Sequence, residues 1–167
     1  MGQTLIPRFI ANTLRTLRSG VPLRAALIGL SLLLAFLSIS PVSAATPVSG
    51  TISSNTTWAA TDSPFQVTGN VTVASGVTLT IEPGVTVKFD SGKTLDINGT
   101  LIAQGTSSNK ITFTSSAASP SIGDWKFIRF NSTASSATFD GSGNYLSGSI
   151  LQYCTVEYAG FGSTSPG

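Results

Sequence analysis

The stretch that decides the fold is residues 76–92, which read Gly76-Val-Thr-Leu-Thr-Ile-Glu-Pro-Gly84-Val-Thr-Val-Lys-Phe-Asp-Ser-Gly92. Two runs in it, residues 77–81 and 85–89, alternate apolar with polar side chains. A period of two sends one set of side chains to a core and the other to water, as in a half-buried strand. Glycines stand at both ends and between the runs, where a corner needs backbone angles that other residues resist. The stretch therefore predicts two short strands joined by tight corners.

Short strands of the same design continue through the rest of the chain. No segment after residue 45 has a helical apolar stripe, because glycine and serine interrupt every candidate. This pattern predicts an all-β domain. The strands that we expect are residues 71–73, 77–81, 85–89, 95–97, 101–103, 111–114, 125–130 and 149–159.

The spacing of these strands favours one all-β architecture over another. Corresponding strands begin at residues 71 and 95, 77 and 101, and 85 and 111, which are separations of 24, 24 and 26. Three short strands and three corners within about 24 residues are typical of one turn of a three-sided parallel β-helix. A sandwich or barrel is the alternative. We expect about three turns within residues 66–167, preceded by an N-terminal cap or lead-in at 45–65 in which Trp58 and Phe65 cover the first turn.

The apolar members of the alternation are predicted to face the core of this coil. A Ser/Ala/Gly-rich insertion at 131–148 interrupts the third turn, and the apolar phase slips within 125–130, which predicts a bulge or corner near Phe127. The predicted inward residues are Val71, Val73, Val77, Leu79, Ile81, Val85, Val87, Phe89, Leu95, Ile97, Leu101, Ala103, Ile111 and Phe113.

The first 44 residues have a different character. Residues 1–24 contain four arginines and no acid, residues 25–39 are an uncharged apolar run, and small residues follow Pro41. This order predicts a secretory signal peptide, residues 1–44, that is cleaved after Ala44 and exports the protein to the cell surface or the medium. An uncleaved anchor is the alternative, but fifteen helical residues span about 22 Å, less than a bilayer core of about 30 Å. We therefore expect no stable membrane span after cleavage.

Residues 45–167 contain five basic and seven acidic side chains, which give a net charge of −2. The charge of +2 on the whole chain thus comes from the signal peptide. A domain of this charge has no basic patch of the kind that nucleic acids require. One cysteine, Cys154, excludes an internal disulfide, so packing and backbone hydrogen bonds must hold the exported domain together.

Several segments together resemble a known family. Residues 76–89, 99–106 and 111–115, with Gly123-Asp-Trp125 and Val156-Glu-Tyr-Ala-Gly160, are similar to exported bacterial proteins with right-handed parallel β-helix repeats, the pectate-lyase-like fold. The resemblance covers about residues 50–160. It implies a long solenoid of which this chain supplies the N-terminal turns, and a location at the cell surface or outside the cell. In that family an aromatic residue flanked by glycines usually follows Gly-Asp-Trp, whereas Lys126 and Phe127 follow here.

The residue inventory excludes several kinds of active site. The chain has no histidine, so Ser-His-Asp and Cys-His catalysis and zinc sites with imidazole ligands are excluded within it. Cys154 lies on an expected strand and is interpreted as a small packed residue rather than a nucleophile. No Walker loop, dinucleotide fingerprint or Gly/Asp calcium nonapeptide occurs. We therefore predict no cofactor and no metal.

Acid, base and aromatic side chains come together at one place in the sequence, Asp124, Trp125, Lys126 and Arg129. These four residues are the candidate glycan-binding site, although a Trp beside a corner acid is more often a packed core residue with a turn cap. The sequence favours a protein without catalysis in this chain, with a structural, adhesive or glycan-binding role toward extracellular polysaccharide or the cell envelope. The alternative is the N-terminal part of a polysaccharide lyase or glycoside hydrolase whose active site lies on later turns.

Overall fold

The computed structural model describes residues 44–160. The predicted signal peptide therefore lies, apart from Ala44, outside the described residues, as does the C-terminal segment 161–167. Within 44–160 the chain forms strands joined by corners and one 3-10 helix, η1 (Ala60–Asp62). The strands are β1 (Thr46–Ile52), β2 (Thr56–Trp58), β3 (Phe65–Val73), β4 (Thr78–Ile81), β5 (Thr86–Phe89), β6 (Thr94–Ile97), β7 (Thr100–Gln104), β8 (Ile111–Ser115), β9 (Phe127–Phe130), β10 (Thr138–Phe139), β11 (Tyr145–Ser147), β12 (Ile150–Gln152) and β13 (Cys154–Val156).

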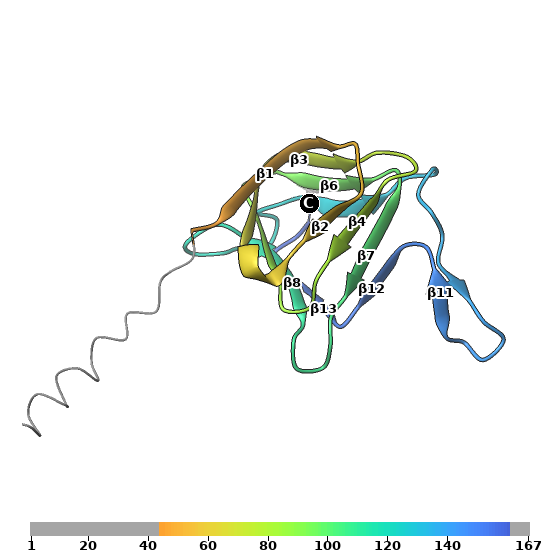
Figure 1. The fold of residues 1–167 in the computed structure, drawn as a ribbon. Coiled ribbons are helices and arrows are strands. Elements are labelled where there is room, and N and C mark those ends of the chain that lie inside the picture. The colour runs from red at the N-terminus through yellow and green to blue at the C-terminus, as the bar shows by residue number, and fades with distance from the viewer. Residues whose placement is uncertain (1–43, 161–167) are drawn as a thin grey trace, which may run out of the picture. The chain divides into compact units, whose positions relative to one another are not determined.

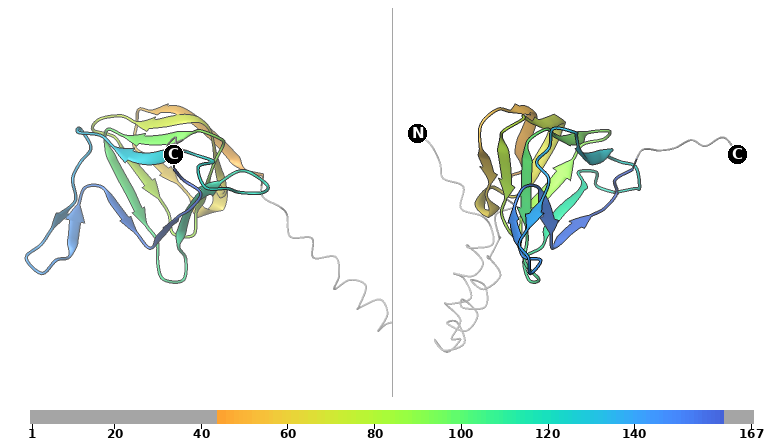
Figure 2. Two further views of the ribbon diagram at one scale, coloured as in Figure 1. Left: turned by 180° about the vertical axis from the view of Figure 1, so that it is seen from behind. Right: turned by 90° about the vertical axis from the view of Figure 1, so that its right-hand side faces the viewer.

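Parallel pairing arranges these strands, except β10 and β11, as three ladders on the sides of a coil (Figure 1). The first ladder is β2–β4–β7–β12. The second runs from the N-terminal half of β3 through β5 and β8 to β13, and the third runs from the C-terminal half of β3 through β6 to β9. Each strand lies beside its counterpart one turn later, and the turns follow one another from orange to blue in Figure 2. The prediction of an all-β, right-handed parallel β-helix is confirmed.

The core of the coil consists of the side chains that the alternation predicted to point inward. All fourteen of them are buried. Residues at equal places in successive turns stack into columns, for example Val73 beside Ile97 and then Phe130. Aromatic pairs reinforce the columns, since Phe89 stacks on Trp125 with 4.0 Å between ring centroids and Trp58 stacks on Phe65 at 5.0 Å. No buried side-chain N or O atom in the described part of the chain lacks a hydrogen-bond partner.

The register between turns agrees with the predicted repeat in two of three places. Val71 pairs with Leu95 and Thr86 with Thr112, which are the expected separations of 24 and 26 residues. In the first ladder Leu79 pairs with Leu101, so the separation is 22 and the predicted value of 24 is wrong there. The corner before β7 has only two residues, 98–99, whereas the corner before β4 has four, 74–77.

The apolar phase changes before β9, as the sequence predicted. Trp125 is fully buried inside the coil, while Ile128 and Phe130 pair with the inward residues Leu95 and Ile97. Phe127 instead pairs with Thr94 and joins the outer surface. The change of phase therefore lies between Trp125 and Ile128 and brings Phe127 to the outside.

Residues 45–65, which the sequence assigned to a cap or lead-in, contain parallel strands of the same ladders. β1 runs along the whole of β3, with a register shift between Val48 and Gly50, and β2 pairs with β4. Trp58 is buried at the end of β2 and Phe65 at the start of β3, so both aromatic side chains contribute to the first rungs of the core. No helix within residues 44–160 is long and apolar enough to cross a membrane.

The insertion between β9 and β12 departs from the coil. It contains β10 and β11, which pair antiparallel and project from the ladders, as the light-blue hairpin of Figure 1 shows. Asp140 closes the hairpin turn, because its carboxylate accepts hydrogen bonds from the backbone N–H of Ser142 and Asn144 and from the Asn144 amide, each at 2.8 Å. The Asp140-Gly141 pair is thus part of the turn of a hairpin.

Candidate glycan-binding surface

The four residues predicted to form a site are placed in different surroundings. Asp124 lies at the corner before β9, where its carboxylate accepts a hydrogen bond from Ser115 Oγ at 2.6 Å and another from the Ser121 N–H at 3.0 Å. These hydrogen bonds, with that from Ser115 the stronger cause, lower the pKa of Asp124 from its ordinary value. The Asp124 carboxylate thus stays ionised and holds the corner together.

Trp125 lies inside the coil. Its side chain is fully buried, stacks on Phe89, and donates a hydrogen bond from Nε1 to the backbone oxygen of Glu157 at 2.9 Å. A ring in this position offers no exposed face to a sugar. The packed arrangement that the sequence favoured is therefore the one that Trp125 adopts.

Lys126 and Arg129 follow Trp125 in the same segment. The Lys126 backbone joins two turns, because its N–H donates to the Lys93 oxygen at 2.9 Å. The Arg129 guanidinium contacts Asp96 Oδ1 through both Nε and Nη2 at 2.6 Å and lies 5.0 Å from the centre of the Phe127 ring. Arg129 is therefore a paired cation on the outer surface of β9.

The outer surface of β6 and β9 carries a strip of polar side chains around this ion pair. Asp96 is buried although it points outward, and its second oxygen accepts a hydrogen bond from Thr94 Oγ1 at 2.8 Å. At the C-terminal ends of the same strands, Asn131 donates from its amide to Asn98 Oδ1 at 2.8 Å. We call the outward residues Thr94, Asp96, Asn98, Phe127, Arg129 and Asn131 the polar strip.

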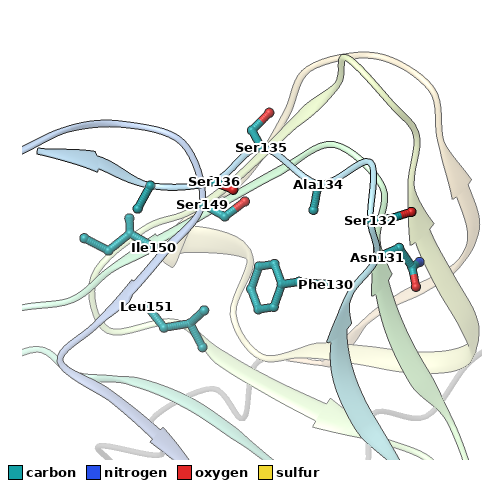
Figure 3. Close-up of a pocket in the computed structure, with 10 residues that line it drawn as sticks. Phe130, Asn131, Ser132, Ala134, Ser135, Ser136, Ser149, Ile150 and Leu151 are labelled. Carbon is teal, nitrogen blue, oxygen red and sulfur yellow. The ribbon is translucent and has the colours of Figure 1, made fainter.

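An open hollow lies directly beyond this strip, where the insertion leaves β9 and rejoins the coil at β12. Its volume is about 510 Å³. Figure 3 shows the Phe130 ring in the middle of the hollow, directed toward Ile150 and Leu151 of β12, with Ala134, Ser136 and Ser149 beside it. Phe130 remains 43% exposed. The hollow is lined by Phe130, Asn131, Ser132, Ala134, Ser135, Ser136, Ala137, Ser149, Ile150 and Leu151.

The chemistry that this surface can perform follows from its side chains. An exposed aromatic ring can stack on the apolar face of a sugar, and hydroxyl and amide groups can bond to sugar hydroxyls. Within residues 44–160 no group of three or more His, Cys, Asp and Glu residues is placed to hold a metal ion. Cys154 lies on β13, where partial burial raises the pKa of its thiol and so disfavours the reactive thiolate.

The hollow could not be predicted from the sequence, because it combines residues near 130–137 with residues 149–151 and none of the lining side chains is charged. Phe130 is in the segment 125–130 where the apolar phase slips and is not among the predicted inward residues, and residues 131–148 are predicted only as an insertion. The one available signal was a large aromatic residue placed directly before a Ser/Ala-rich insertion. The side chain of a core residue at such a place can become exposed to solvent, because the chain that follows it leaves the coil.

Comparisons with known proteins bear on this architecture. A family model described as a pectate-lyase-like β-helix domain matches residues 50–166. Protein bark beetle of Drosophila melanogaster is 44% identical over 54 residues, which are 32% of this chain and 2% of that protein. The chain thus corresponds to a small part of the length of that relative. No solved structure matches the chain.

Proposed function

Because the chain belongs to the pectate-lyase-like β-helix domain family, we propose that it is an exported, non-catalytic β-helix that binds extracellular glycan. The coil serves as a rigid support, and the binding surface is the hollow around Phe130 together with the neighbouring polar strip. The protein acts as a structural or adhesive component outside the cell. The leader-like character of residues 1–44 supports export.

One observation carries the glycan-binding proposal, namely the exposed Phe130 ring in an open hollow beside hydrogen-bonding side chains. Among residues 44–160, Phe130 is the last member of a column whose earlier members, Val73 and Ile97, have no exposed surface. Leaving a phenylalanine 43% exposed forgoes roughly 1 kcal/mol of the burial free energy that a core position provides. A ligand that covers the ring recovers part of this free energy.

The surroundings of Phe130 are also ordered enough to form a site. Asn131 is held by its backbone bond to the Ile97 oxygen at 2.9 Å and by its amide bond to Asn98. Ser149 is held in turn, because its Oγ accepts the N–H of Leu101 at 3.2 Å. Side chains fixed in this way lose little conformational entropy when they bind a ligand.

Binding of the full exported chain to an array of extracellular polysaccharides tests the proposal. We expect retention of at least one glycan with a Kd of about 1 mM or tighter, and no release of reducing or unsaturated ends from it. Phe130→Ala should weaken retention about tenfold, which is about 1.4 kcal/mol. Failure to retain any polysaccharide, or release of new chain ends, would refute the proposed function.

A further inference from the structure

Asp96 is an outward residue of the coil whose carboxylate is nevertheless largely removed from water. It lies within β6 and keeps only 8% of its surface exposed. Its Oδ1 is contacted by Arg129 through Nε and Nη2 at 2.6 Å, and its Oδ2 accepts the Thr94 hydroxyl at 2.8 Å. A buried carboxylate without a cation is costly, so an arrangement that moves Arg129 away from Asp96 is strongly unfavourable.

The segment that carries Arg129 contains two sets of apolar residues that could face the core. Trp125 and Phe127 have one parity in the sequence, and Ile128 and Phe130 have the other. Side chains of successive strand residues point to opposite faces, so only one set can be inward along the strand itself. We call the choice between the two sets the phase of β9.

Apolar contacts discriminate weakly between the two phases. In the observed phase Ile128 lies beside Leu95, but Ile128 is only partly buried and Phe130 is 43% exposed. The other phase would place Phe127 beside Leu95, and its aromatic ring would also fill a core position. The buried Trp125 does not determine the choice, because the phase already changes between Trp125 and Ile128.

The charged residues discriminate strongly. In the other phase the Arg129 side chain would be directed into the coil, and Asp96 would lie beside Ile128. The carboxylate would lose both guanidinium contacts, and its neighbour on β3, Thr72, carries no charge. In the observed phase the guanidinium lies 5.0 Å from the centre of the Phe127 ring, and the Arg129 side chain stays 57% exposed, so it remains hydrated while it covers Asp96.

We infer that the Asp96–Arg129 pair selects the phase of β9 and thereby determines that Phe130, rather than Phe127, lies on the inner side of the strand. A buried ion pair can act in this way without adding much stability, because packed apolar residues often replace such a pair at little cost, whereas separating its charges is expensive. The phase of β9 does not depend on a ligand, so this role of the pair is independent of the proposed function.

NMR of the full chain can distinguish the two phases. In the observed phase the Phe127 ring lies beside Thr94, whereas in the other phase it would lie beside Leu95, so a nuclear Overhauser effect between Phe127 and the Leu95 methyl groups reports the other phase. Asp96→Leu combined with Arg129→Leu should keep the equilibrium constant for folding within about tenfold, which is about 1.4 kcal/mol. This double variant should show the Phe127–Leu95 effect and a second set of amide signals for 127–130.

Two single variants separate phase from stability. Arg129→Leu alone leaves the Asp96 carboxylate without its cation and should lower the equilibrium constant for folding at least about 100-fold, which is about 2.8 kcal/mol. Arg129→Lys keeps a cation and should retain the observed phase with a single set of signals. Gln104→Leu combined with Gln152→Leu is the matched control, because this outward pair also joins two turns, at 3.3 Å, but on another ladder. The control should leave the signals of 127–130 single.

A single set of signals and an unchanged contact of Phe127 with Thr94 in the double variant would overturn the inference, since the apolar residues would then select the phase by themselves. Loss of folding in the double variant would overturn it as well, because the pair would then supply stability rather than specificity. The same holds if Arg129→Leu alone leaves stability unchanged, or if Arg129→Lys adopts the other phase. None of these measurements involves a glycan, so their failure leaves the proposed function untouched.

Discussion

At the scale of single residues, close contacts at the corners set how the turns meet. Gly99 lies against the backbone of the preceding turn, where an added Cβ would be 2.1 Å from the Val77 oxygen and 2.3 Å from the Ala74 oxygen. The next residue, Thr100, donates its N–H to the same Val77 oxygen at 2.8 Å. The two-residue corner before β7, and hence the 22-residue register of the first ladder, depends on glycine at this position.

Gly99→Ala is therefore expected to destabilise the coil by about 1–3 kcal/mol, because the new methyl group forces two rigid backbone segments apart. Chemical unfolding followed by circular dichroism measures this change. Gly141→Ala is the matched control, since no atom lies within 4 Å of its added Cβ, and its stability should change by less than about 0.5 kcal/mol. Equal effects of the two substitutions would contradict the close approach at Gly99.

Asp124 gives a prediction about pH. The hydrogen bonds from Ser115 and the Ser121 N–H lower the pKa of Asp124 in the folded protein below its ordinary value of 3.8. A carboxyl group of this kind stabilises the fold above the unfolded pKa, and the contribution disappears as the pH falls through the lower, folded pKa. Ser115→Ala should raise the pKa of Asp124 in an NMR titration and make the protein unfold at a higher pH in acid. An unchanged titration midpoint would show that Ser115 does not cause the shift.

At the scale of elements, the strands of the coil could be predicted because their inward side chains repeat. The alternation located β4, β5, β6, β7 and β8 to within a residue or so, and it located every inward residue that it proposed. β1 and β2 were missed because polar residues dominate 45–57, and their few inward residues, Val48, Ile52 and Trp58, do not form a recognisable alternation. The exact register of the first ladder required knowledge of the close contact at Gly99.

The candidate site was harder to predict than the strands. Neighbouring residues in the sequence, Asp124 and Trp125, project into different surroundings because a corner and a phase change intervene before β9. The hollow joins residue 130 to residues 149–151 across an insertion whose path no local pattern encodes. Periodicity predicts which residues are buried in a repeat, but it contains no information about the place where the repeat is interrupted.

The hairpin of the insertion is expected to be dispensable for folding. β10 and β11 pair with each other and not with the ladders, and Asp140 and Tyr145 stabilise the hairpin internally. Its base is already closed, because a Cβ on Gly148 would be 2.0 Å from the Ser136 oxygen. Replacing residues 138–147 by a Gly-Ser link should thus change the free energy of unfolding by less than about 1 kcal/mol. A molten or unfolded product, seen by circular dichroism, would show that the hairpin supports the coil.

At the scale of the whole molecule, the core of the coil is apolar and the outward positions of its strands are mostly polar, while large apolar side chains such as Ile122, Phe139 and Leu146 are exposed outside the core. Such a domain, with one cysteine and no disulfide, depends on packing and on its ladders in any compartment. We expect export to remove residues 1–44, which would leave Thr46 and β1 close to the new terminus. Intact-mass measurement of the exported protein checks this, and a mature chain that still begins at Met1 would contradict it.

Because of the ladders, the response of the coil to a mechanical force depends on the direction of that force. Each turn bonds only to the turns beside it, and these hydrogen bonds run along the axis of the coil. Tension along the axis therefore breaks the hydrogen bonds between turns one pair of turns after another. The insertion is attached differently, because it joins the C-terminal end of β9 to the N-terminal end of β12. A pull on the insertion along the direction of β9 or β12 therefore loads the hydrogen bonds of that strand together, in shear, rather than one turn after another.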